Sequence, residues 1–173
     1  MSIGSLVEPL LRRVALFQGL RPDQLIEIAR RAERVQFKPG NAIIREGEPG
    51  DAAYLIVSGT AQRTAGPGSD EIVELQPGTL IGEMAMLVET DYSSTVVCRE
   101  AARTLKITRS GLLEQMSADL SLADHLLEHL AGRLRHLAGE LRRIDALLGA
   151  AEQPMHPPRL LIAKSRPEAA HSG

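Results

Sequence analysis

Residues 82–87 read Gly-Glu-Met-Ala-Met-Leu, and residues 93–97 read Ser-Ser-Thr-Val-Val. The first stretch is typical of a short helix, and it lies between two strand-like runs at residues 79–81 and 94–97. This order places the first backbone N–H groups of the helix beside a cluster of hydroxyls. Because the first amides of a helix lack internal partners and carry partial positive charge, the arrangement suits a bound anion.

The chain around this stretch breaks into short runs typical of β-strands. We expect eight of them, at residues 34–37, 41–45, 53–58, 60–65, 71–75, 79–81, 94–98 and 103–108. Gly or Pro stands at most junctions, as at Pro39-Gly40 and Pro77-Gly78. Many short strands with turn signals at near-regular spacing predict a β-sandwich or barrel, interrupted by one helix at residues 83–88.

Helical periodicity flanks the β-rich segment on its N-terminal side. Leu6, Leu10 and Val14 recur at three- and four-residue spacing, as do later apolar residues. We therefore expect helices over about residues 6–32, the second of which starts at Pro22-Asp23. The predicted fold class is α+β.

A heptad-like seam marks a long C-terminal helix. Its apolar residues are Leu127, Leu130, Leu134, Leu137, Leu141, Ile144 and Leu148, with Leu120 and Ala123 upstream. A helix packed on its own domain would also be amphipathic, but the narrow stripe favours a two-helix seam, most simply a homodimer through residues 120–148. Gly149 is expected to stop the helix. We expect one domain at residues 1–148, with its dimerisation helix at about 119–148, and a flexible proline-rich tail at 149–173.

Composition excludes several classes of protein. The 173 residues suit one domain, and a net charge of −2 with a pI near 6.2 marks no nucleic-acid or membrane-surface partner. A single cysteine, Cys98, excludes an intramolecular disulfide and fits a reducing compartment. No apolar run approaches the roughly 20 residues that span a bilayer, and no secretory signal is recognisable. We expect a cytoplasmic protein without a membrane anchor.

The two stretches at residues 82–87 and 93–97 resemble the phosphate-binding cassette of cyclic nucleotide-binding domains. Members include the catabolite activator/FNR regulators, the regulatory subunits of protein kinase A and cyclic nucleotide-gated channels. The family pattern is Gly-Glu-Leu-Ala-Leu, a few residues, then Arg-Ser/Thr-Ala-Thr-Val. Residues 37–62, with the turn Glu-Gly-Glu-Pro-Gly-Asp at 46–51, resemble the first half of the domain. The resemblance covers about residues 10–148 and implies an antiparallel jelly roll of about eight strands, with N-terminal helices, a short cassette helix and a long C-terminal helix.

The resemblance also implies a ligand site. Its residues would be Gly82, Glu83, Met84, Ala85, Tyr92, Ser93 and Ser94. In the family the cassette Glu accepts a hydrogen bond from the ribose 2′-hydroxyl, which would be the role of Glu83; the alternative is that Glu83 only caps its helix. Amides of residues 82–85 and the Ser93 hydroxyl would meet the cyclic phosphate, unless Ser93 is an ordinary strand residue.

Tyr92 stands where the family has its phosphate-binding Arg. Tyrosine offers one neutral hydrogen bond in place of a charged, planar fork. Losing a buried charge partner costs about 2–5 kcal/mol, which weakens binding on the order of 30-fold to several thousand-fold. The candidates to supply the missing charge are Arg45, Arg99 and Arg103. The implied ligand is cyclic AMP or cyclic GMP, and we expect no other cofactor.

No pattern of catalytic or metal-binding residues stands out. His125 and His129 share a helix face at i, i+4. Asp124 and Glu128 are close to them, but these carboxylates suit a solvated helix face equally well. There is no nucleophile–histidine–acid order with the required context and no Walker-type loop. We expect neither catalysis nor a bound metal.

Three functions remain open. The first is a non-catalytic sensor that binds a cyclic nucleotide, dimerises through its long helix and signals to an unknown effector protein. The second is a degenerate, nucleotide-free dimerising scaffold, which Tyr92 favours. The third is a transcription regulator of the catabolite activator/FNR type that lacks its helix-turn-helix. Only about 25 residues follow the long helix, so we expect no direct DNA binding. The sensor is the preferred interpretation.

Overall fold

The computed structural model describes residues 3–64 and 71–151. The chain divides into two compact units, Met1–Leu134 and Arg135–Gly173. The N-terminal part forms α1 (Ile3–Leu11), a 3-10 turn (Ala15–Phe17) and α2 (Pro22–Arg31). The predicted helical region at residues 6–32 is therefore present, with α2 starting at the predicted proline.

The β-domain is built from antiparallel strands, as predicted. Its strands are β1 (Glu33–Phe37), β2 (Ala42–Ile44), β3 (Pro49–Gly50), β4 (Ala52–Ser58), β5 (Ala61–Thr64), β6 (Ile72–Leu75), β7 (Leu80–Ile81), β8 (Thr90–Asp91), β9 (Val96–Cys98) and β10 (Ala102–Thr108). They form two four-stranded sheets, β1-β10-β4-β7 and β2-β9-β5-β6, and the small pair β3-β8. The eight expected strands are all found. The pair β3-β8 was missed because Pro49–Gly50 has the composition of a turn and Thr90–Asp91 lies in a polar stretch, so neither shows a β-type run.

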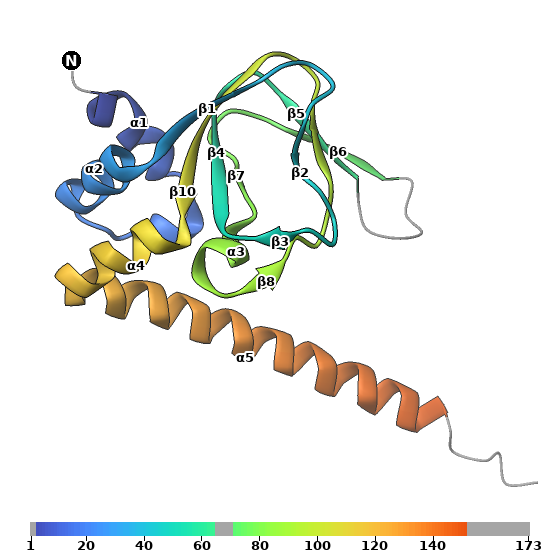
Figure 1. Ribbon diagram of the computed structural model, residues 1–173. Helices are drawn as coiled ribbons and strands as arrows, with labels where there is room; N and C mark the ends of the chain where they lie inside the picture. The colour runs from blue at the N-terminus through green and yellow to red at the C-terminus, as the bar shows by residue number, and fades with distance from the viewer. Residues whose placement is uncertain (1–2, 65–70, 152–173) are drawn as a thin grey trace, which may run out of the picture. The chain divides into compact units, whose positions relative to one another are not determined.

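The core has two parts because β4 alternates its side chains between two faces. Ala53 and Leu55 pack with Leu25 and Ile28 of α2 in a cluster between the N-terminal helices and the sheet (Figure 1). Ile56 faces the other way, into the interior of the β-domain, where a second cluster gathers. This period-two alternation buries both faces of the strand.

One short helix, α3 (Glu83–Leu87), interrupts the strands at the predicted place, between β7 and β8. A helix of this length is not stable alone. The guanidinium of Arg109 holds it, since Nη1 donates to the carbonyls of Gly50 at 3.1 Å, Ala85 at 3.1 Å and Val88 at 2.9 Å. Arg109 is the first residue of α4 (Arg109–Ala118), so a single side chain ties α3 and β3 to α4.

The last helix, α5 (Leu120–Ala151), follows directly after Asp119. The carboxylate of Asp119 accepts hydrogen bonds from the side chain of Gln24 at 2.7 Å and from the backbone N–H of Leu122 at 3.1 Å. Hydrogen bonds from Gln24 first, and then from Ser121 and Leu122, lower the pKa of Asp119. The first turns of α5 are thereby joined to α2.

The start of α5 uses a different face from the one that the seam predicts. Leu122 and Leu126 are buried in the core, whereas Leu120 is exposed. The upstream extension of the seam to Leu120 therefore does not lie on the buried face. The remaining seam positions with exposed side chains are Leu127, Leu134, Leu137, Leu141, Ile144 and Leu148.

The predicted end of α5 was wrong. The helix continues through Gly149 to Ala151. A glycine stops a helix by adopting a positive φ, and Gly149 is not among the glycines of the described segments that do so. The predicted flexible tail falls at residues 152–173, outside the described residues. None of the helices in the described segments is long and apolar enough to cross a membrane.

We predict that Arg109→Met lowers the free energy of unfolding by about 2 kcal/mol, because hydrogen bonds from a charged group to three carbonyls are lost. Chemical denaturation monitored by circular dichroism measures the change. The matched control is Arg99→Met, which alters an exposed arginine. Equal stabilities of the two variants would contradict the role given to Arg109.

Candidate functional site

A cavity of about 230 Å³ opens beside α3. Its walls come from β2, β5, β6, β7, α3, β8, the segment after β8, β9 and α5. All seven residues of the predicted ligand site line it: Gly82, Glu83, Met84, Ala85, Tyr92, Ser93 and Ser94. The cavity therefore brings together segments that are far apart in the sequence, and α3 forms part of its edge.

Tyr92 lines this cavity, and its side chain offers no free hydrogen-bond donor to a ligand. Its side chain is only 8% exposed, and its hydroxyl donates to the backbone carbonyl of Ala52 at 2.9 Å. Burial is the main cause that raises the pKa of Tyr92. The residue is therefore a neutral packing group, with its single proton already committed.

Two glycines make room for the Tyr92 ring. A Cβ at Gly82 would lie 2.8 Å from a ring carbon of Tyr92, and one at Gly50 would lie 3.1 Å from the same carbon. Gly82 also has a φ of 74°, in the left-handed region that glycine adopts without strain. The ring and both glycines form one packed unit.

The backbone at the start of α3 is partly occupied. The amide of Ala85 donates to the carbonyl of Gly82 at 3.1 Å, inside the turn that begins the helix. The Ala85 methyl is buried in the core of the β-domain. Of the four residues whose amides were expected to meet a phosphate, Ala85 thus already has a backbone partner.

Glu83 is bonded to α5. Its Oε1 accepts a hydrogen bond from Nη1 of Arg133 at 3.0 Å and lies 3.4 Å from Nε2 of His129. The carboxylate is 21% exposed and the Arg133 side chain 47% exposed, so solvent weakens the pair. Glu83 therefore links the rim of the cavity to two successive turns of α5.

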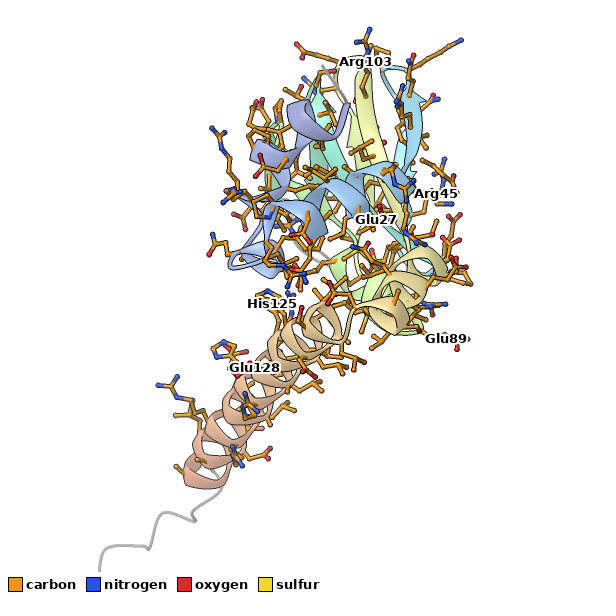
Figure 2. The ribbon with its side chains drawn as sticks, turned by 90° about the vertical axis from the view of Figure 1, so that its left-hand side faces the viewer. Glu27, Arg45, Glu89, Arg103, His125 and Glu128 are labelled. Atoms are coloured by element: carbon orange, nitrogen blue, oxygen red, sulfur yellow. The ribbon has the colours of Figure 1, made fainter. Side chains whose placement is uncertain are left out.

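The cations on the cavity are not the ones that the sequence suggested. Arg63 and Arg133 line it. Arg45 instead lies 4.0 Å from Glu48, and Arg99 and Arg103 are absent from the lining. Figure 2 shows Arg103 at the end of the β-domain remote from α4.

The sequence carried a signal for Arg63. Ala61, Gln62 and Arg63 belong to one strand, in which alternate residues share a face. Because Ala61 is small, apolar and fully buried, Arg63 lies on the inward face with it. Arg133 had no such signal, because it reaches Glu83 across 50 residues of chain.

Hydroxyls and apolar groups complete the lining. Within the described residues, the side chains of Ser93 and Ser94 have no hydrogen-bond partner, and both border the cavity. The apolar wall consists of Ile44, Leu75, Ile81 and Val96. Two carboxylates, Glu83 and Asp91, also border the cavity. Free hydroxyls, cations, a carboxylate and an apolar wall can together bind an anionic molecule that has a hydroxyl and an apolar face.

Among the described residues, the histidine and cysteine considered next form no second site of this kind. Nε2 of His125 lies 3.0 Å from the carbonyl of Leu16, so this histidine is a packing contact of α5 (Figure 2). Burial raises the pKa of the Cys98 thiol. In the segments that the structure describes, no three residues of the His, Cys, Asp and Glu types are grouped to hold a metal ion.

The chain matches the family model of the cyclic nucleotide-binding domain over residues 34–119. It is similar to a CRP-like cAMP-activated global transcriptional regulator of Mycobacterium tuberculosis, with 27% identity over 132 residues. That match covers 75% of this chain and 59% of the regulator. The chain thus spans about three fifths of the length of this curated relative.

Two solved structures share the fold. One is the N-terminal domain of a transcriptional regulator from Streptomyces coelicolor, with a TM-score of 0.69 and 25% identity over 76% of this chain and 93% of that one. The other is a cyclic nucleotide-binding-like protein from Brucella abortus, with a TM-score of 0.56 and 31% identity over 64% of this chain and 97% of that one. The chain belongs to the cyclic nucleotide-binding domain family.

Proposed function

We propose that this protein is a non-catalytic sensor that binds cyclic AMP or cyclic GMP in the cavity beside α3 and signals through α5. The observation that carries the proposal is the position of Glu83, which borders the cavity and is bonded to α5 at the same time. The name of the relative from Mycobacterium tuberculosis includes activation by cAMP, which agrees with the proposed ligand.

The lining suits each part of a cyclic nucleotide. The ribose hydroxyl would donate to the carboxylate of Glu83, and the hydroxyls of Ser93 and Ser94 would donate to phosphate oxygens. The apolar wall would contact a face of the base. A neutral tyrosine at position 92 weakens the phosphate part of the site, so we expect lower affinity than in relatives that have Arg there.

Competition between the ligand and Arg133 for the carboxylate of Glu83 would couple ligand binding to the position of α5. A ribose hydroxyl bonded to this carboxylate would share or replace the bond from Arg133, and would change the contacts that hold α5. Arg109 ties α3 to α4, which directly precedes α5. Ligand therefore shifts an equilibrium between two positions of α5 by its difference in affinity for them.

The output surface would be the second half of the helix. Leu137, Leu141 and Ile144 are exposed and follow heptad spacing, which suits a partner helix in a homodimer. An effector protein would then recognise the dimer. The alternative function is a dimerising scaffold without a nucleotide, which is favoured by the buried, uncharged Tyr92.

Titration with ligand separates the two functions. We expect cyclic AMP or cyclic GMP to raise the melting temperature saturably, because a ligand at ten times its Kd stabilises the native state by about 1.4 kcal/mol. Calorimetry then gives the Kd, and Glu83→Gln should weaken binding tenfold or more. Glu89→Gln, a change in another carboxylate that does not line the cavity, serves as the control. A flat response to both nucleotides would refute the sensor and leave the scaffold.

The proposal that α5 dimerises through its heptad seam is tested by measuring the oligomeric state. We predict that the double variant Leu137→Glu, Ile144→Glu is a monomer. Glutamates at apolar seam positions would repel their counterparts on the partner helix, and burying them in the interface would cost the free energy of their desolvation. Analytical ultracentrifugation measures the mass. Ala146→Glu adds a charge to the same helix away from the seam and should leave the dimer intact. A wild-type monomer at micromolar concentration would contradict the proposed dimer.

A further inference from the structure

We propose that Arg63 is the phosphate-binding cation of this site, and that it takes over from β5 the role that position 92 has lost. The proposal rests on the proposed function, since it names the residue that recognises the anionic part of the ligand. It concerns a side chain outside the cassette, on a different strand from the usual arginine position.

Strand register places Arg63 on the face of β5 that borders the cavity. It lies opposite Val96 of β9 on one side and Val73 of β6 on the other. Directly opposite residues of antiparallel strands point to the same face. Val96 is fully buried in the interior cluster, so the Arg63 side chain projects from the face that encloses the cavity.

The same register brings Arg63 near the free hydroxyls. Ser94 precedes Val96 by two residues, which makes it a diagonal neighbour of Arg63. Diagonal neighbours lie about 7–8 Å apart, within reach of a long side chain. The amide of Thr64 donates to the carbonyl of Thr95 at 3.2 Å, so β5 continues alongside this part of the chain. Arg63 and Ser94 can therefore bind oxygens of one phosphate group.

Of the two arginines that line the cavity, Arg63 is the one without an ion-pair partner among the described residues before a ligand binds. Arg133 is already bonded to Glu83. Among the described residues, Arg63 has no ion pair, and Asp91, the second carboxylate of the lining, forms none with it. A guanidinium keeps its charge at all physiological pH values and presents parallel N–H donors that match two phosphate oxygens.

Packing shows that position 92 already has a structural role. The ring of Tyr92 lies so close to Gly82 and Gly50 that a Cβ at either glycine would crowd it. An arginine side chain that reaches the cavity from β5 requires no change in the packing of Tyr92 against Gly82 and Gly50. It follows that the site selects ligands with a phosphate group over the corresponding neutral nucleosides.

The test is calorimetric titration of full-length wild type, Arg63→Gln, Arg63→Lys and the remote control Arg103→Gln with cyclic AMP, cyclic GMP, 5′-AMP and adenosine. We expect Arg63→Gln to weaken the binding of phosphate-containing ligands at least tenfold, with adenosine affinity unchanged. Arg63→Lys should keep part of the affinity, since it retains the charge and loses the fork. Circular dichroism melts test whether the variants are folded. Because Arg63 is an exposed residue, its replacement should not unfold the domain.

The outcomes separate this inference from the proposed function. If the wild type binds a cyclic nucleotide and Arg63→Gln binds it equally well, the sensor stands and the role of Arg63 is refuted. If the wild type binds only 5′-AMP, and Arg63→Gln abolishes that binding, Arg63 keeps its role and the cyclic ligand is refuted. Binding of no phosphate compound by the wild type overturns both.

Discussion

Three backbone carbonyls, those of Gly50, Ala85 and Val88, converge on one nitrogen of the Arg109 guanidinium. The helix α3 has too few residues to persist without such support. Its position in turn fixes Glu83 at the rim of the cavity. Because Arg109 also begins α4, the same hydrogen bonds connect the candidate site to the helices that follow it in the chain. The rest of the account depends on this connection.

At position 92, the packed interior requires a neutral side chain, whereas a bound phosphate requires a positive charge. Tyr92 satisfies the interior, with its hydroxyl bonded to Ala52 and its ring against two glycines. A phosphate needs a positive charge that this buried position does not supply. The two cations that line the cavity come instead from β5 and α5, at Arg63 and Arg133. Function in this family depends on the side chains at the site, and the shared fold alone does not determine it.

Much of the fold could be predicted from the sequence because its signals are local. Alternation and turn glycines predicted every strand except the two-residue pair β3-β8, and the cassette pattern located α3. The end of α5 at Gly149 was wrong, since glycine at a helix end is a tendency that the backbone conformation there did not follow. The contacts of Arg109 and Arg133 were missed for a different reason. Each joins residues distant in the sequence, and neither periodicity nor composition reports such contacts. The position of Arg63 could have been inferred from the alternation of side chains along β5.

The central claim is that Glu83 exchanges its partner on α5 for the ligand. The most direct test is the affinity of Arg133→Gln for the cyclic nucleotide that the wild type binds, with Arg135→Gln as the control on the same helix. The account predicts tighter binding, by up to about fivefold, because the ligand no longer competes with a solvent-weakened ion pair worth up to about 1 kcal/mol. Unchanged or weaker binding by Arg133→Gln would show that Glu83 does not couple the ligand to α5.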